Sequence, residues 1–418
     1  MSSTPAEVPD AAVGARPGAR GDEPVARSTI AFLAFLGVAM AVGVDIALPA
    51  FHRIADGLSI ADPSRVSLVG TTYFLGMATG QLVFGPASDR FGRTRTLRVG
   101  LALATVGALA SMVAPRFGVL LAARAAWGLG AAAPAVLRFA IARDLFDGDR
   151  MARVVTTVQA VFLLGPIVVP LIGQAVLAAG PWRAVFGAAT LVTATAFAWT
   201  TRFPETLDPE HRRPLDVSAL GRAFVTVAKT RTAVGHMAAQ TFTTGAFIIF
   251  LGSSQRIVDR VYGRASLFGV IFAGAGTILA VSLTINARLI RRFGARTMVL
   301  VASCAALALA ATGLAAFSAT GGRPPLLVWF VWVAFSNTMF SLMTPMCQAL
   351  ALEPMGALAG SASAIHGFVT MAGGALLASI FDSLIDRSVT PMAVGYTLYS
   401  GLALLSLVWA RRPQPSPR

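Results

Sequence analysis

The hydrophobicity pattern divides the chain into twelve long apolar runs, and this pattern constrains the fold more than any other feature. A helix needs about 20 apolar residues to cross the hydrocarbon core of a bilayer, and each run is about that long. Only 13% of the residues are charged, whereas a soluble protein has roughly 25%. We therefore predict an all-α integral membrane protein with twelve transmembrane helices, at residues 28–50, 65–86, 96–115, 117–142, 154–179, 182–201, 235–254, 265–287, 297–319, 325–351, 359–381 and 392–410.

The spacing of the runs predicts two six-helix bundles. The longest polar connection, residues 202–234, separates residues 28–201 from residues 235–410. It contains a stretch that predicts an amphipathic helix, which either lies on the membrane surface or only joins the bundles. We expect a disordered tail at residues 1–27 and a short tail at residues 411–418.

A short internal repeat indicates that the two bundles arose by tandem duplication. The segment RFGRTRT at residues 90–96 resembles RFGART at residues 292–297, and each follows the second run of its half. Repeats of this kind in transporters are related by a pseudo-two-fold axis. The second copy lacks the acidic residue that precedes the first, so the two halves are not equivalent.

The distribution of basic residues predicts the orientation of the chain. Of the 34 lysines and arginines, twenty-three lie in connections on the side of the N-terminus and nine on the other side. Cytoplasmic connections carry the excess of such residues, so we expect both termini in the cytoplasm and the chain in the plasma (inner) membrane. The net charge of +15 is spread between apolar runs rather than gathered on one face, which argues against nucleic acid as a partner.

Motifs of common enzymes and metal sites are missing from the sequence. It contains no GxxxxGK[ST] phosphate loop and no HExxH, CxxC or GxSxG motif. Cys304 and Cys347 lie in apolar runs and are interpreted as core residues. We therefore expect neither an enzyme nor a cofactor or metal, and no direct coupling to ATP. We also expect a monomer in the lipid bilayer.

Two charged residues within the runs are the strongest candidates for energy coupling. Asp45 lies five residues before Ala50, about 8 Å from the end of its helix, and Arg124 lies at a similar depth, about 10 Å. A charge inside a membrane span costs roughly 2.5 kcal/mol or more, so both are candidates for function. We expect them to pair, because pairing offsets their desolvation. A carboxyl that gains and loses a proton there would couple proton entry to substrate exit; alternatively, Asp45 only reaches the outer interface.

A charge-dense turn is predicted at residues 85–95, GPASDRFGRTR, between the second and third helices. We expect Gly85 to let the second helix approach the eleventh. Asp89 would then lie at the N-terminal end of the eleventh helix, near Gly360 and Ser361, where backbone N–H groups favour an anion.

Further residues of this turn complete a predicted conformational gate. Arg93 is expected to pair with Asp144 at the inner end of the fourth helix, beside Arg90 and Gly92. Such a latch would exist only when the cytoplasmic side is closed. The alternative is that the basic residues only set the topology.

Four stretches together resemble the Bcr/CflA-type drug:proton antiporters of the major facilitator superfamily. They are VDIALPAF at 44–51, GQLVFGPASDRFGRTRTL at 80–97, ARDLF at 142–146 with GPIVVPLIG at 165–173, and ALALEPMGALAGSASA at 349–364. The resemblance implies the major facilitator fold and alternating access. It also implies export of hydrophobic or amphipathic drugs, such as bicyclomycin, phenicols or sulfonamides, in exchange for protons. Two alternatives remain: an importer of a small metabolite, and a membrane sensor or lipid-handling protein that transports nothing.

The fifth run carries residues that resemble the antiporter motif of this superfamily, namely Gly165, Pro166, Pro170 and Gly173. Proline removes a helical hydrogen bond and glycine allows close approach, so we expect a bent, tightly packed helix.

Other polar and aromatic residues within the runs are candidates for substrate contacts. Arg138 is interpreted instead as a structural residue that reaches the inner surface with its long side chain. The candidates for substrate binding are Tyr73, Trp127, Gln240, Phe247, Asn337 and His366.

Overall fold

The computed structural model describes residues 23–212 and 217–411, and these residues form helices and connections without a strand. They contain twelve helical segments long and apolar enough to cross a membrane, as predicted. The first half comprises α1 (Glu23–Asp45), α3 (Leu68–Phe91), α4 (Arg93–Val113), α5 (Phe117–Leu145), α6 (Gly148–Leu163), α7 (Gly165–Ala179) and α8 (Trp182–Thr201). The second half comprises α10 (Arg231–Arg256), α11 (Phe268–Phe293), α12 (Ala295–Ala319), α13 (Leu326–Leu352), α14 (Ala359–Asp382) and α15 (Thr390–Arg411).

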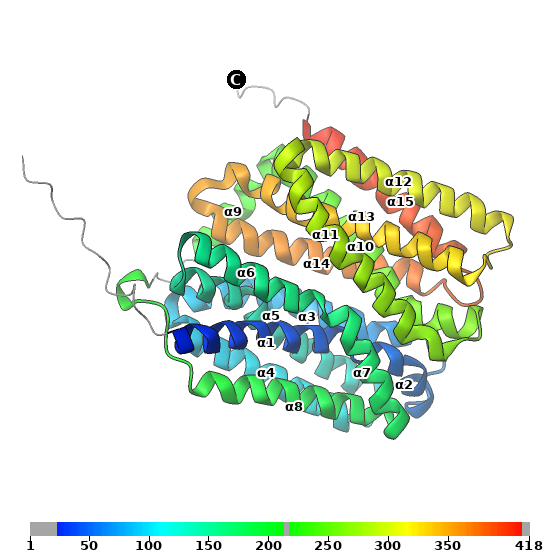
Figure 1. The fold of residues 1–418 in the computed structure, drawn as a ribbon, viewed down its shortest axis with the longest axis horizontal. Coiled ribbons are helices and arrows are strands. Elements are labelled where there is room, and N and C mark those ends of the chain that lie inside the picture. Colours follow the sequence, from blue (N-terminus) through cyan, green and yellow to red (C-terminus); the bar gives the residue numbers. More distant parts are fainter. Residues whose placement is uncertain (1–22, 213–216, 412–418) are drawn as a thin grey trace, which may run out of the picture.

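The helices gather into two bundles that lie side by side (Figure 1). The blue-to-green helices α1 to α8 form one bundle, and α10 to α15 form the other. The bundles pack against each other mainly through α3 with α14 and α7 with α11. We call the end of the molecule that holds Glu23, Arg411 and the short helix α9 (Val217–Lys229) the terminal end, and the opposite end the far end.

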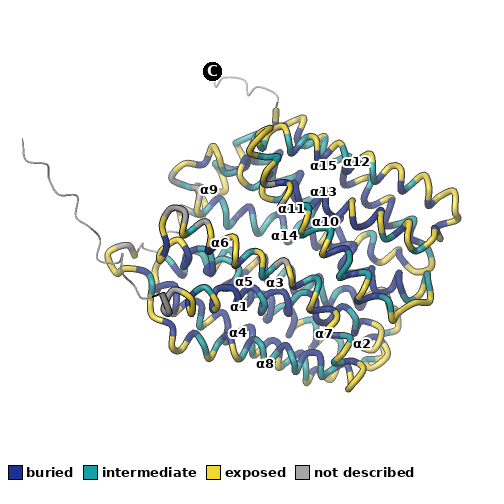
Figure 2. Tube along the Cα trace, viewed as in Figure 1, coloured by how far each residue is buried: buried dark blue, intermediate teal, exposed yellow. Residues whose placement is uncertain are grey.

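Large apolar side chains cover the outward faces of both bundles, where a soluble protein would be polar. Figure 2 shows exposed residues along the outer helices and buried ones where helices face each other. A bilayer is the solvent that satisfies such a surface, because its hydrocarbon core is itself apolar. Examples of these exposed side chains are Val99, Val106, Leu191, Val270, Leu327 and Leu405.

Several helices extend beyond the apolar runs that predict them. Residues 23–27 belong to α1, so the prediction of a disordered tail as far as residue 27 is wrong at its end; residues 1–22 and 412–418 lie outside the described part. Pro24 is tolerated there because it needs no N–H partner in the first helical turn. Likewise, α10 begins at Arg231 rather than at residue 235.

The predicted turn at residues 85–95 is mostly helix. α3 continues through Pro86 to Phe91, and only Gly92 separates it from α4. Gly92 has φ of 98°, which is costly for a residue with a side chain. The turn was predicted to begin too early because Gly85 and Pro86 are typical turn residues, although a helix can continue past both.

The predicted distortion of the fifth span is present as a break between α6 and α7. α6 ends at Leu163 and α7 begins at Gly165, immediately before Pro166. A Cβ on Gly165 would overlap the Cβ of Ala41, and one on Gly173 would lie 2.8 Å from the carbonyl oxygen of Ile46. The glycines therefore let α7 pack closely on the first span.

The linker helix α9 packs on the second half. Ala223 and Val227 are buried, and Val227 shares a small apolar cluster with Met355 and Ala362. Phe224 is exposed, so it does not join Val227 on the buried face. α9 thus contacts the terminal end of α14 and of α10.

Candidate functional site

Asp45 is the last residue of α1 and is buried near the far end of the first half. The structure gives its carboxylate no ion pair or hydrogen bond within the described residues. Tyr73 of α3 interacts electrostatically with both Asp45 and Arg124. A buried acid without a fixed partner is a group whose protonation state can change during a cycle.

Arg124 of α5 is buried and held by aromatic rings and one carbonyl. Its guanidinium carbon lies 4.5 Å from the ring centroid of Tyr73 and 4.8 Å from that of Trp127. Its Nε donates to the carbonyl oxygen of Val69 at 3.0 Å, whereas Nη1 has no hydrogen-bond partner. Cation–π contacts stabilise a guanidinium more when water is excluded, as it is here.

The predicted ion pair between Asp45 and Arg124 is not formed in this structure. Both residues lie near Tyr73, and they share it as a neighbour instead of binding each other. Depth follows from counting residues along a helix, whereas the direction of a side chain depends on helix rotation. The hydroxyl of Tyr73 has no hydrogen-bond partner and lies against Gly43, where a Cβ would overlap it.

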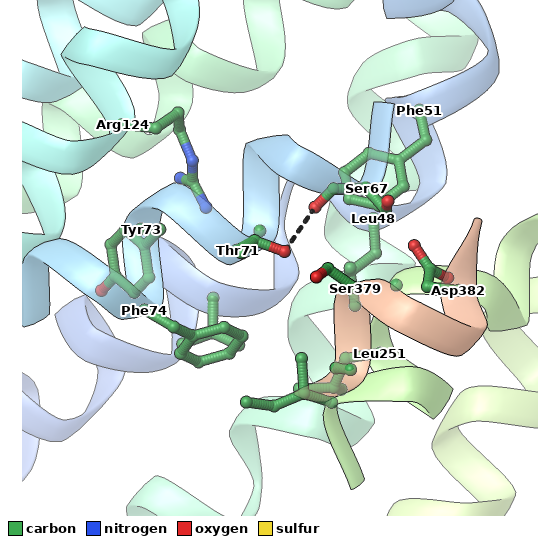
Figure 3. Close-up of a pocket in the computed structure, with 15 residues that line it drawn as sticks. Leu48, Phe51, Ser67, Thr71, Tyr73, Phe74, Arg124, Leu251, Ser379 and Asp382 are labelled. Carbon is green, nitrogen blue, oxygen red and sulfur yellow. Dashed lines mark hydrogen bonds between the residues drawn. The ribbon is translucent and has the colours of Figure 1, made fainter. Parts of the chain in front are cut away.

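A small pocket at the far end lies next to Arg124 and between the two bundles (Figure 3). Its volume of about 20 Å³ is close to the smallest that holds a water molecule. Arg124 of the first half and Asp382 of the second lie on opposite sides of it. Most of the other lining is apolar, from Val44, Leu48, Phe51, Phe74, Ile248 and Leu251.

The gate candidates at the terminal end form a connected set of polar contacts. Arg93 donates from Nε to Asp144 Oδ2 at 3.0 Å, which is the expected contact, and from Nη1 to Ser88 Oγ at 2.7 Å. It also forms an ion pair with Asp89. Arg90, the neighbour of Asp89, has its guanidinium over the ring of Phe91 instead.

Glu205, which follows α8, adds a contact that the sequence analysis did not anticipate. Its Oε1 accepts hydrogen bonds from the backbone N–H of Arg93 at 2.7 Å and of Thr94 at 3.4 Å, at the N-terminus of α4. A carboxylate is stabilised at that end of a helix. A Cβ on Gly92 would overlap the Glu205 carboxylate, which adds a second reason for glycine there.

The predicted contact between Asp89 and the eleventh span is missing from this conformation. The Cβ positions of Gly85 and Gly360 both face open space. The carboxylate of Asp89 is directed to Arg93 of its own half. The expected close approach at Gly85 is therefore not made in this structure, in which the bundles meet at the far end, and it stays a prediction for the conformation closed at the terminal end.

The duplication extends to an ion pair at the corresponding place in the second half. Arg296, near the start of α12, donates from Nη2 to both carboxylate oxygens of Glu353, just after α13, at 2.9 Å. Exposure separates the two pairs: the side chains of Arg93 and Asp144 are 8% and 16% exposed, those of Arg296 and Glu353 71% and 55%.

The candidates for substrate contact are dispersed over both halves. Tyr73 and Trp127 meet edge to face at 5.8 Å between centroids, and Trp127 continues to Phe186 inside the first half. Of these, Tyr73 lines the pocket at the far end.

The remaining candidates belong to the second half, where they bond one another or the core. His366 Nε2 lies 2.8 Å from Gln240 Oε1, which joins α14 to α10. Asn337 accepts a hydrogen bond from the Tyr396 hydroxyl at 2.9 Å. Phe247 packs against the main hydrophobic core. These contacts stabilise helix pairs, and they leave one ring nitrogen of His366 and the Asn337 amide nitrogen unpartnered.

Arg138 does not reach the surface as expected. It is buried, and its guanidinium carbon lies 4.5 Å and 4.8 Å from the ring centroids of Phe139 and Phe162. Nε and Nη1 lack hydrogen-bond partners. Neighbouring α1 and α6 enclose the side chain, so it cannot extend along the helix to water.

One buried ion pair was not predicted from the sequence. Arg256 at the end of α10 donates from Nη2 to Asp382 Oδ1 at 2.6 Å and to the Asp382 carbonyl oxygen at 2.8 Å. Asp382 follows its apolar run directly and Arg256 follows its run after one residue, and both were interpreted as parts of connections. They are 126 residues apart, and no spacing rule links such distant positions.

Comparisons with known proteins agree with this architecture. Residues 30–379 match the family model of the Major Facilitator Superfamily. The chain is 31% identical over 375 residues to a bicyclomycin resistance protein homolog of Haemophilus influenzae, which covers 88% of this chain and 92% of that relative. It is 24% identical over 376 residues to the multidrug resistance protein MdtL of Salmonella heidelberg, with 90% and 92% coverage.

A solved structure supports the same fold at low sequence identity. The D-xylose-proton symporter superposes with a TM-score of 0.77 at 15% identity, over 93% of this chain and 98% of the symporter. At this identity the likeness concerns the arrangement of helices only.

Proposed function

The chain belongs to the major facilitator superfamily, and from this premise we propose that it exports small hydrophobic or amphipathic drugs in exchange for protons. The names of two relatives, a bicyclomycin resistance protein homolog and a multidrug resistance protein, support the class of substrate. The two bundles would expose a central site to either side in turn.

The observation that carries the proposal is the buried, unpaired carboxylate of Asp45 near Tyr73, whose ring also contacts Arg124. In our proposal Asp45 carries the proton. The free Nη1 of Arg124 is available to stabilise the carboxylate once the proton leaves. An anion and a cation that come together in this way compensate each other's desolvation.

The orientation and location are part of the same proposal. The terminal end faces the cytoplasm, because twenty-three of the 34 lysines and arginines lie in its connections and tails. The protein then resides in the plasma (inner) membrane as a monomer, with the far end outside. Phenicols, bicyclomycin and sulfonamides are the drugs to test first.

Transport by everted membrane vesicles tests the proposal directly. Vesicles that contain the protein should take up drug when a proton gradient is imposed, and drug uptake should dissipate the gradient. For Asp45→Asn, present at the normal protein level, we expect the rate of drug uptake to fall to that of empty vesicles. Asp56→Asn is the matched control, because Asp56 lies at the same end, is exposed and pairs with His52.

The outcomes separate the proposal from its alternatives. Proton-driven movement of a sugar or amino acid in the opposite direction would indicate an importer. No response to any drug or to the gradient would indicate a sensor or lipid-handling protein. Full activity of Asp45→Asn would refute the role of Asp45.

A further inference from the structure

A buried ion pair lies at the far end, in the opposite half from Asp45. Arg256 Nη2 and Asp382 Oδ1 are 2.6 Å apart, and their side chains are 5% and 4% exposed. Gly252, one turn before Arg256 on α10, leaves room for the carboxylate: a Cβ there would lie 3.1 Å from Asp382 Oδ1. Burial of two charges is costly unless their geometry is good, so a pair at the end of a span calls for an explanation.

The carboxylate of Asp382 also faces the first half. Ser67, the residue before α3, is placed to donate a hydrogen bond to it. Both residues line the pocket that separates Asp382 from Arg124, and Figure 3 shows Ser67 and Asp382 on the same side of that pocket. Asp382 therefore lies where the two bundles meet, bonded to Arg256 in its own bundle and facing Ser67 in the other.

The position of this contact relates it to one conformation. α3 packs along α14, and Ser67 and Asp382 stand at the far end of that packed pair. At the terminal end of the same two helices, the Cβ positions of Gly85 and Gly360 face open space. If the bundles rock about their middle, Ser67 and Asp382 must separate when the far end opens, whereas Arg256 and Asp382 stay together within one bundle.

We propose that Asp382, held in place by Arg256, is the positioning residue of the far-end gate and closes it through Ser67. The inference rests on the proposed alternating access. It places the positioning residue of the far-end gate in the second half and its contact, Ser67, in the first. Arg256 orients the carboxylate and compensates its charge in both conformations. The hydroxyl of Ser67 contributes only when the far end is closed, so it shifts the population toward that state.

The distance between spin labels at the far end measures the gate without any substrate or proton gradient. Labels at Ala61→Cys and Ala319→Cys, both exposed and one in each half, are introduced after Cys304 and Cys347 are replaced by serine and alanine. Double electron–electron resonance in lipid nanodiscs then resolves far-closed and far-open populations. Ser67→Ala should raise the ratio of far-open to far-closed molecules about tenfold, which is of the order of one hydrogen bond to a charged group.

Asp382→Asn should shift the ratio in the same direction, because a neutral amide oxygen accepts a weaker hydrogen bond from Ser67 than a carboxylate does. A combination with Ser67→Ala should add little, because both changes act on the same contact. Asp386→Asn is the matched control: its ion pair with Arg260 lies at the same end of the same bundle but is exposed, at 61% and 34%. An unchanged distance distribution in Ser67→Ala, or an equal shift in Asp386→Asn, would overturn the proposal. The labels report the distance without any transport. If Ser67→Ala shifts the populations in a protein that exports no drug, the proposed function is refuted and the proposed gate is not.

Discussion

The two corresponding ion pairs at the terminal end should differ strongly in their contribution to stability. Asp144 accepts from a buried Arg93 in the first half, whereas Glu353 accepts from an exposed Arg296 in the second. Asp144→Asn is therefore expected to destabilise the protein several times more than Glu353→Gln. Both changes remove one negative charge and keep the size of the side chain.

The magnitudes follow from burial and from the partners that remain. Exposed pairs contribute about 0.2–1 kcal/mol, so we expect about 0.5 kcal/mol for Glu353→Gln. Loss of one partner of a buried pair costs about 3–5 kcal/mol. Arg93 keeps its ion pair with Asp89 and its hydrogen bond to Ser88. We therefore expect about 2 kcal/mol for Asp144→Asn.

Equilibrium unfolding of the purified protein by SDS in mixed micelles measures both changes. The single mutants and the Arg93→Gln, Asp144→Asn double mutant form a cycle that isolates the coupling energy of this pair from the contacts of Arg93 with Asp89 and Ser88. Added salt should weaken the effect of Glu353→Gln and leave that of Asp144→Asn nearly unchanged. Equal destabilisation by the two single changes would refute the reasoning from burial.

Two further changes test the packing of the first half. Gly128→Ala should lower stability by roughly 1–3 kcal/mol or prevent folding, because its Cβ would overlap the Tyr73 carbonyl oxygen on α3. Gly118→Ala, which has open space around it, should be neutral. The yield of monodisperse protein distinguishes the two variants, and tolerance of both changes would contradict the close approach of α3 and α5. Arg138→Met should leave the stability measured by SDS unfolding unchanged or raise it, because among the described residues no acidic partner compensates this buried charge. A clear loss of stability would mean that the guanidinium has a stabilising partner.

The helices were predictable because the bilayer leaves few choices. Backbone groups in hydrocarbon must bond within their own segment, so each long apolar run had to become a helix. The ends were less predictable: α10 extends to Arg256 and α14 to Asp382, and these two charges bind each other in the interior instead of meeting water. A charge just beyond an apolar run resembles a loop residue in the sequence, so both were interpreted as parts of connections.

The candidate site was predictable in its residues more than in its contacts. A charge inside an apolar run identifies Asp45 and Arg124 as candidates. The sequence predicted an ion pair between them, whereas in the structure both are neighbours of Tyr73. Arg93 and Asp144 were predictable as partners because each lies beside a helix end on the same side. Arg256 and Asp382 were not, because only the packing of α10 on α14 brings them together.

The attachment of the central linker at both of its ends limits how far the bundles can part at the terminal end. Arg98 binds the carbonyl oxygens of Thr200 and Phe203, Thr94 binds that of Pro204, and Glu205 caps α4, so the linker remains on the first half up to about Leu207. α9, which begins at Val217, is packed on the second half. About ten residues connect these two points and reach at most about 35 Å when fully extended. The linker is thus a tether whose length sets the widest opening at the terminal end, and shortening it would restrict the largest cargo that can enter there.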